Sequence, residues 1–269
     1  SCIALFESID ELKTNGRRDI SPVQHAISKL REKMKIKYDR PIPSGWKIGI
    51  GTPRADISGK NSGNPWEDAP KNDMRFITDR EMLSVSIEEE KNTLRIIWKG
   101  HPEYGRNFTV TTVWKKRKNG LSAGTFKYSN YNGKDFIEEI YFPIIKCPVT
   151  RDSGLAFGGW DMGILWKGDS FLAPGSLSRH NYCAMQFSAL LNSNAANMYF
   201  DHRDKGHHIK FCEFATSGDG RTFSYTGIHL VGLGQKPKKA YSIPYESCFG
   251  TFSGSWFNAA QIYRKWAEK

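Results

Sequence analysis

Hydrophobic and polar side chains alternate over much of the chain from residue 82 onwards. At 83–88, Leu83, Val85 and Ile87 alternate with two serines and a glutamate, which indicates a strand with one solvated face. The same criterion predicts strands at 94–98, 108–114, 136–145, 182–191, 198–200, 209–214 and 223–231. Successive strands joined by short turns form hairpins, and hairpins in series favour antiparallel sheets over βαβ units. We therefore predict a mainly β fold.

The composition agrees with this fold class, because glycine and aromatic residues are plentiful while long helical patterns are few. A length of 269 residues allows one large β domain or two small ones. No apolar run approaches the length needed to span a bilayer. The chain shows no secretory signal and does not begin with Met, so we interpret it as a processed chain or a fragment. Its location is left open, with a secreted or periplasmic protein as one alternative.

The formal net charge of +11 would suit an acidic partner such as nucleic acid, an anionic polysaccharide or a membrane surface. Residues 115–118 form a basic hairpin tip that could serve such a partner. The basic residues are nevertheless scattered over several short runs rather than gathered in one. We therefore favour an ordinary basic surface and no nucleic-acid partner.

The N-terminal part predicts one amphipathic helix followed by a long loop. Ser21 is a suitable N-cap, Pro22 fits the first turn, and an apolar stripe then runs to Met34. Such a helix could bind a membrane or nucleic acid, but we favour packing on its own domain. Residues 41–73 are rich in Gly, Pro, Asn and Asp and predict a long loop. Within it Trp66 would either stack on a sugar or pin the loop to the core.

Five cysteines occur, and no two have the spacing of a zinc-binding pair. Cys183, Cys212 and Cys248 lie in apolar, strand-like surroundings, where an unbridged cysteine behaves as a small hydrophobic residue. Cys2 stands where a lipid-modified cysteine would follow signal cleavage, although Ser1 before it could equally be a residue left by cloning. We expect no metal and no cofactor.

The last stretch of the chain predicts a strand, a turn and a helix. Phe249 and Phe252 suit a half-buried strand, and residues 253–255 have the composition of a turn. Ser255 can cap the following helix, because its hydroxyl can accept a hydrogen bond from an unpaired amide of the first turn. Apolar residues then recur at helical spacing at Trp256, Ala259, Ala260, Tyr263 and Trp266.

Residues 250–267, reading GTFSGSWFNAAQIYRKWA, resemble the end of the N-terminal β-sandwich domain of certain glycoside-hydrolase-like proteins. The resemblance extends upstream to residues 174–176, 185–187 and 198–204 and covers roughly the C-terminal third of the chain. It implies an antiparallel β-supersandwich of the galactose-mutarotase-like type. It also implies a catalytic (β/α)8 barrel beyond Lys269, which would contain the catalytic residues. We accordingly expect a helical and loop extension at 1–77, either as a separate subdomain or as part of the same domain, a sandwich at 78–254 and a linker helix at 255–269.

The densest polar cluster is Asp201–Asp204 together with His207 and His208. A metal site is the less favoured interpretation, because the spacing matches no specific site. The resemblance implies that this loop leans over the mouth of the barrel, where His202, Arg203 and Asp204 would hydrogen-bond sugar hydroxyls. The alternative is a turn in which Asp204 bonds local amides.

A second candidate sugar site lies in residues 151–179, where glycines interrupt the chain and aromatic residues are interleaved. We expect an irregular excursion between the sheets, in which Trp160 and Trp166 form a stacking platform and Asp161 accepts hydroxyl hydrogens. Glycoside hydrolysis needs two carboxyl groups that face each other across the sugar. No such pair can be assigned from this sequence, so the catalytic residues are unknown and we expect the chain alone not to be catalytic.

The predicted function is therefore that of a non-catalytic β-sandwich domain of a glycoside hydrolase. It would pack against a catalytic barrel and contribute to a carbohydrate site. One alternative is a freestanding carbohydrate-binding module. The other is a basic protein that binds nucleic acid or an anionic glycan. The sequence contains no nucleophile elbow, P-loop or dinucleotide fingerprint that would indicate a different enzyme class.

Overall fold

The computed structural model describes residues 45–51, 75–150, 152–159, 162–167, 175, 177–181, 185–192, 196–231 and 237–269. The predicted helix at 21–34, most of the predicted loop at 41–73, Cys2 and Cys183 lie outside these residues. No helix in the described part of the chain is both long and apolar enough to cross a membrane.

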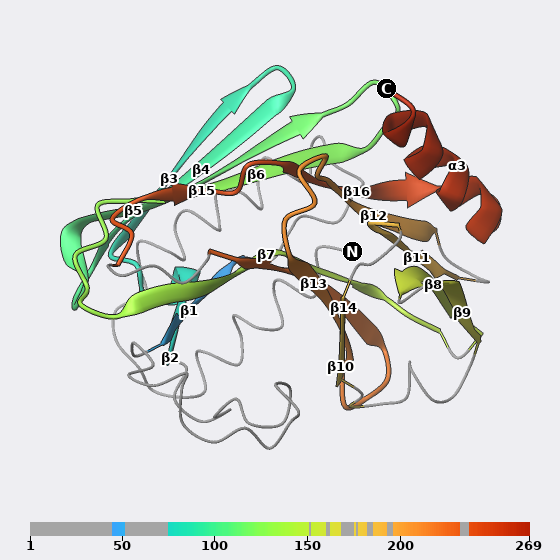
Figure 1. The fold of residues 1–269 in the computed structure, drawn as a ribbon, viewed down its shortest axis with the longest axis horizontal. Helices are drawn as coiled ribbons and strands as arrows, with labels where there is room; N and C mark the ends of the chain where they lie inside the picture. The colour runs from blue at the N-terminus through green and yellow to red at the C-terminus, as the bar shows by residue number, and fades with distance from the viewer. Residues whose placement is uncertain are drawn as a thin grey trace.

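Two antiparallel sheets pack face to face and form a β-sandwich (Figure 1). The six-stranded sheet has the order β10 (Leu177–Asn181), β13 (Lys210–Thr216), β14 (Thr222–Leu230), β7 (Phe136–Pro148), β1 (Lys47–Gly51), β2 (Arg75–Thr78). The ten-stranded sheet has the order β3 (Ser84–Glu90), β4 (Thr93–His101), β5 (Gly105–Lys116), β6 (Ser122–Ser129), β16 (Glu246–Phe252), β12 (Asn197–Arg203), β11 (Phe187–Leu191), β8 (Gly154–Gly159), β9 (Met162–Lys167), and β15 (Tyr241–Ser242) pairs with β6. The predicted mainly β, antiparallel fold class is confirmed.

Strands β3 to β6 follow one another along the chain and form the hairpin series that alternation predicts. Strand β3 continues two residues beyond the predicted strand at 83–88, to Glu90, which pairs with Thr93. The more distant pairings join strands far apart in the sequence: β16 lies between β6 and β12, and β1 pairs with β7. These pairings close the two sheets over one core.

The core fills the space between the sheets and is rich in aromatic side chains. Trp46 is buried there and meets the edges of Trp98 and Phe126, at ring-centroid distances of 5.7 and 6.0 Å. Trp114 from β5 lies against Gly124 of β6, where an added Cβ would come within 2.3 Å of the indole ring. The glycine therefore makes room for the largest side chain at that point of the core.

Residues 151–179 contain more regular structure than the sequence indicated. Strands β8 and β9 form an antiparallel hairpin in which Leu155 pairs with Trp166, and β8 continues the ten-stranded sheet beside β11. The expectation of an irregular excursion is thus wrong for these twelve strand residues. Glycine weakens a strand only modestly, and pairing with a neighbouring strand can override that preference.

The C-terminal strand, turn and helix are confirmed. Helix α3 (Trp256–Ala267) follows β16, and the Ser255 hydroxyl accepts a hydrogen bond from the Phe257 amide, as expected for its N-cap. The helix lies on the outer side of the ten-stranded sheet, where Ala259 is fully buried and Tyr263 packs on Phe187 (Figure 1). Trp256, which we placed on the same apolar face, is instead 49% exposed.

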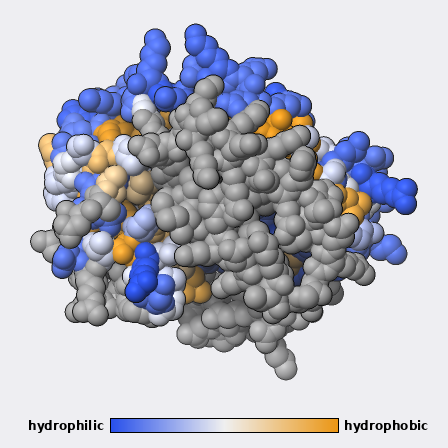
Figure 2. Space-filling model, turned by 180° about the vertical axis from the view of Figure 1, so that it is seen from behind, coloured by the Kyte–Doolittle hydropathy of each residue, from blue (hydrophilic) through white to orange (hydrophobic). Residues whose placement is uncertain are grey.

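Part of the expected N-terminal extension belongs to the sandwich, because β1 and β2 are strands of the six-stranded sheet. Cys147, Cys212 and Cys248 are buried and form no disulfide with one another. Seen from the side opposite to Figure 1, the upper rim of the molecule is hydrophilic, and hydrophobic residues show as small separate spots among the coloured residues (Figure 2).

Candidate functional site

His202 lies in β12 with its side chain directed between the two sheets, where it is fully buried. Its Nδ1 is 2.9 Å from the Ser247 hydroxyl, and its Nε2 is 3.0 Å from the hydroxyl of Tyr225 on the opposite sheet. Burial holds the pKa of His202 well below its usual range, so the ring is neutral at pH 7. His202 thus links the sheets by hydrogen bonds on both sides of its ring.

A second buried histidine, His229 of β14, lies 5.0 Å from His202 between ring centroids. Its Nε2 bonds the carbonyl oxygen of Phe142, which can only accept, so the ring hydrogen is on Nε2. Nδ1 therefore accepts a hydrogen bond from the Tyr245 hydroxyl at 2.7 Å. Burial lowers the pKa of His229 to about 4. We call His202, His229, Tyr225, Tyr245 and Ser247 the inter-sheet histidine network.

Asp204 follows β12 directly and is only 2% exposed. Its Oδ1 accepts hydrogen bonds from the Gly206 amide and His208 Nδ1, and its Oδ2 accepts from the His208 amide and Lys210 Nζ. Burial alone would raise the pKa of Asp204, but the hydrogen bonds from Lys210 and His208 hold it below its usual value. The carboxylate therefore holds the 204–210 turn in place. This arrangement matches the alternative interpretation of the sequence, in which Asp204 forms a turn by bonding local amides.

Arg203 points to the opposite side of the sheet from His202, because neighbouring strand residues alternate. Its side chain is 17% exposed, and its Nε lies 3.5 Å from Asp201 Oδ2. Asp201 also accepts a hydrogen bond from the Tyr199 hydroxyl at 2.9 Å, and burial raises its pKa to about 6. The three predicted loop residues are therefore close in sequence but do not converge on one site.

The second predicted site lies mostly outside the described residues, since these do not include Trp160 or Asp161. Trp166 lies in β9, and only its backbone is described. Sugar contact by these residues, and by His202, Arg203 and Asp204, stays a prediction. Within the described residues, no group of three or more His, Cys, Asp or Glu side chains is arranged to hold a metal ion.

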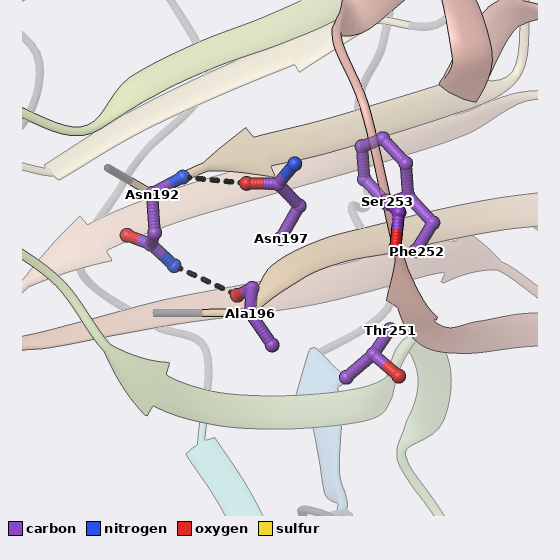
Figure 3. Close-up of a pocket in the computed structure, with 6 residues that line it drawn as sticks. All are labelled: Asn192, Ala196, Asn197, Thr251, Phe252 and Ser253. Atoms are coloured by element: carbon purple, nitrogen blue, oxygen red, sulfur yellow. Dashed lines mark hydrogen bonds between the residues drawn. The ribbon is translucent and has the colours of Figure 1, made fainter. Parts of the chain in front are cut away.

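A pocket of about 360 Å³ lies where β11, β12 and β16 end near the start of α3 (Figure 3). Its lining residues are Asn192, Ala196, Asn197, Thr251, Phe252 and Ser253. Asn197 Oδ1 accepts a hydrogen bond from the Asn192 amide, and Asn197 Nδ2 donates to the Gly254 carbonyl. The two asparagines therefore tie the end of β11 and the start of β12 to the chain that enters α3. We did not single them out in the sequence.

Two aromatic side chains at the N-terminal end of α3 are exposed. Trp256 is 49% exposed and Phe257 is 55% exposed, and their rings meet edge to face at 6.0 Å between centroids. Exposed aromatic residues next to each other are typical of an interaction surface. We call these two residues the α3 aromatic pair.

The fold and these features together describe a two-sheet antiparallel β-sandwich with a helix on one outer side. No family model matches the sequence, and no curated protein matches it. Solved structures do share the fold. The α-N-acetylgalactosaminidase of Bifidobacterium bifidum in its GalNAc complex aligns over 85% of this chain and 34% of its own, with a TM-score of 0.54 and 10% identity.

The ligand-free form of the same enzyme aligns over 72% of this chain and 32% of its own, with a TM-score of 0.50 and 9% identity. An α-galactosidase from Lactobacillus brevis aligns with a TM-score of 0.42, which is too low to support a conclusion. At about 10% identity the likeness establishes a shared fold only. The chain spans about one third of the length of these enzymes.

Proposed function

We propose that this chain is the non-catalytic β-sandwich domain of a glycoside hydrolase and that it packs against a catalytic (β/α)8 barrel through α3. The observation that carries the proposal is the fold alignment, in which most of this chain corresponds to one third of an α-N-acetylgalactosaminidase. Because a fold can serve many functions, the activity of the whole protein is part of the proposal. We also assign the sandwich to the galactose-mutarotase-like type on the strength of the sequence resemblance.

The α3 aromatic pair supports the docking part of the proposal. A helix whose buried residues already pack on its own sheet gains nothing from two further exposed aromatic rings unless another surface covers them. Ala259 and Tyr263 make the contacts to the sheet, while Trp256 and Phe257 lie near the first turn and remain exposed. Because about half of each side chain is already buried, a partner that covered both rings would bury roughly a further 75–140 Å² of each.

The first test is the intact mass of the native protein from its source. We expect a much larger chain, which should hydrolyse an α-N-acetylgalactosaminide or a related glycoside. A native protein of the size of this chain would overturn the docking proposal.

A pair of variants then tests the surface in the larger protein. Trp256→Ser together with Phe257→Ser should lower its thermal midpoint and expose the region after α3 to proteases, because the interface loses its aromatic contacts. The control is Leu83→Ser, since Leu83 is 52% exposed but precedes β3, at the far end of the sheet. Equal effects of the two changes would contradict docking through α3.

The carbohydrate contact is proposed at Trp160, Asp161 and Trp166 and at residues 202–204 around the end of β12, where Arg203 keeps 17% of its side chain exposed. Aromatic faces pack on the C–H faces of sugar rings, and this part of the proposal rests on the residue types. The replacements Trp160→Ala and Trp166→Ala should abolish saturable sugar binding while preserving the circular dichroism spectrum. Unchanged binding in both variants would contradict a site at these residues and would leave the docking proposal intact.

A further inference from the structure

The outer side of strands β4, β5 and β6 lies at the end of the ten-stranded sheet opposite α3, and no helix or strand of the described residues covers it (Figure 1). Ile96, Phe108, Val110, Phe126 and Tyr128 from these strands are buried in the core. Because side chains alternate along a strand, the residues between them point away from the core.

The strand register places these outward residues in rows. Each row crosses neighbouring strands from β4 toward β6. The two central rows are Arg95–Val113–Thr125 and Ile97–Thr111–Lys127. The rows on either side of them contain the pairs Thr93–Lys115 and Lys99–Thr109. All four cations among them are exposed, and the threonines, Ile97 and Val113 are half-buried between them. We call Arg95, Lys99, Lys115 and Lys127, with the residues between them, the basic face.

The charge of the basic face is compensated only on its β3 side. Glu88 of the neighbouring β3 lies 3.4 Å from Arg95 Nε, and Glu90, which pairs with Thr93, lies on the same side of the sheet in the row of Lys115. In the described part of the chain, no carboxylate lies within 4.0 Å of the ammonium groups of Lys99, Lys115 or Lys127. Neighbouring strands are about 4.8 Å apart and alternate residues about 7 Å apart, so each cation lies roughly 8–12 Å from its nearest neighbour and the two most distant, Lys99 and Lys115, are about 21 Å apart.

We propose that the basic face binds an anionic polysaccharide, a linear chain of sugars that carries sulfate or carboxylate groups. The spacing of the cations suits a ligand whose charges repeat along its length rather than one compact anion. The hydroxyls of Thr93, Thr111 and Thr125 can donate hydrogen bonds to sulfate, carboxylate or sugar oxygens, whereas that of Thr109 already donates to the Asn107 carbonyl. Ile97 and Val113 offer methyl groups to the apolar C–H faces of the sugar rings.

The outward residues favour this ligand over nucleic acid. Sites for single strands combine a basic surface with aromatic side chains on which bases stack. None of the outward residues named above is aromatic. The proposal goes beyond a docking role for α3, because it concerns the opposite end of the sheet and does not need a catalytic partner.

The test compares two triple variants of the 269-residue chain in binding to dextran sulfate, with uncharged dextran as the reference. Lys99→Gln, Lys115→Gln and Lys127→Gln together remove three cations from the basic face. Lys205→Gln, Lys265→Gln and Lys269→Gln together remove three exposed cations from elsewhere, so both variants have the same net charge. Circular dichroism and the thermal midpoint show whether each variant remains folded.

We expect the chain to bind dextran sulfate and not dextran, with an affinity that falls as salt is added. The basic-face variant should bind about 100-fold more weakly, since each cation against an anionic surface contributes roughly fivefold. The control variant should change the affinity by less than about threefold, because its lysines affect only the long-range field.

Three outcomes would overturn the proposal: no binding of dextran sulfate at low salt, equal loss in the two triple variants, or tighter binding of single-stranded or duplex DNA than of dextran sulfate. Equal loss would mean that net charge alone attracts the polyanion. Tighter DNA binding would assign the face to nucleic acid.

Discussion

The replacement His229→Gln tests the inter-sheet histidine network through the pH dependence of stability. A glutamine can retain a donor toward the Phe142 carbonyl and an acceptor toward the Tyr245 hydroxyl, but it does not titrate. Any pH-dependent difference between the two proteins therefore reports the protonation of His229. His202 is present in both proteins, so its own contribution largely cancels.

The magnitude follows from the pKa of His229, which burial lowers to about 4 from an ordinary value near 6.5. Between these two values the unfolded chain binds a proton at this residue and the folded chain does not. Stability from His229 is therefore complete above pH 6.5 and is lost as the pH falls toward 4. The difference in pKa corresponds to about 3 kcal/mol over this window.

The pH dependence of the unmodified protein alone cannot isolate this contribution, because buried carboxyl groups act in the opposite direction. Burial raises the pKa of Asp201 and of Asp79 to about 6. The folded state then binds protons more tightly than the unfolded state between pH 6 and 4, so each group stabilises it as the pH falls. The comparison with a variant removes these opposing contributions.

The assay is urea unfolding of both proteins at pH 7, 6, 5 and 4, followed by tryptophan fluorescence and extrapolated to water. At pH 7 we expect the variant to be less stable by about 1–2 kcal/mol, because its hydrogen bonds are less well placed. That deficit should shrink as the pH falls and reverse between about pH 6 and pH 5, so that the variant is the more stable protein at pH 4.

The control is Gly218→Ala, at a position that carries no titratable group and where an added Cβ would meet no atom. Its stability difference from the unmodified protein should be the same at every pH. If the His229→Gln difference were also constant from pH 7 to 4, His229 would titrate alike in both states and the reasoning from its burial would fail.

Three further changes probe packing, charge and capping. Gly124→Ala should lower the thermal midpoint by several degrees, because the added Cβ would overlap the Trp114 ring at a cost of about 1–3 kcal/mol. Gly218→Ala, where an added Cβ meets no atom, should leave the midpoint unchanged. Lys210→Met should lower the free energy of unfolding, measured in urea, by about 3–5 kcal/mol, because it leaves the buried Asp204 carboxylate without its cation. Glu268→Gln, which removes the exposed ion pair with Arg264, should leave the free energy of unfolding unchanged. Ser255→Ala should lower the free energy of unfolding by about 1 kcal/mol and speed amide hydrogen exchange in the first turn of α3. The control is Ser253→Ala, and equally slow exchange in the two variants would contradict the capping role of Ser255.

Local patterns predicted much of the fold. The alternation at 83–98 gave the β3–β4 hairpin, and the serine before an apolar helical repeat gave the start of α3. Both depend on residues close together in the chain, for which side-chain period and capping chemistry are sufficient. The β8–β9 hairpin was missed because glycine-rich strands lack that period.

The sequence by itself therefore determined that the chain folds into antiparallel hairpins with one helix at its end. Only the tertiary structure decided that His202 faces the core and Arg203 the outer side, because the direction of a strand residue depends on which face its neighbours bury. The basic face also arises in three dimensions: Arg95 and Lys99 belong to β4, Lys115 to β5 and Lys127 to β6, and only the pairing register brings the three strands' cations onto one surface. Pairing between distant strands depends on the packing of both sheets around one core, which no local sequence pattern records.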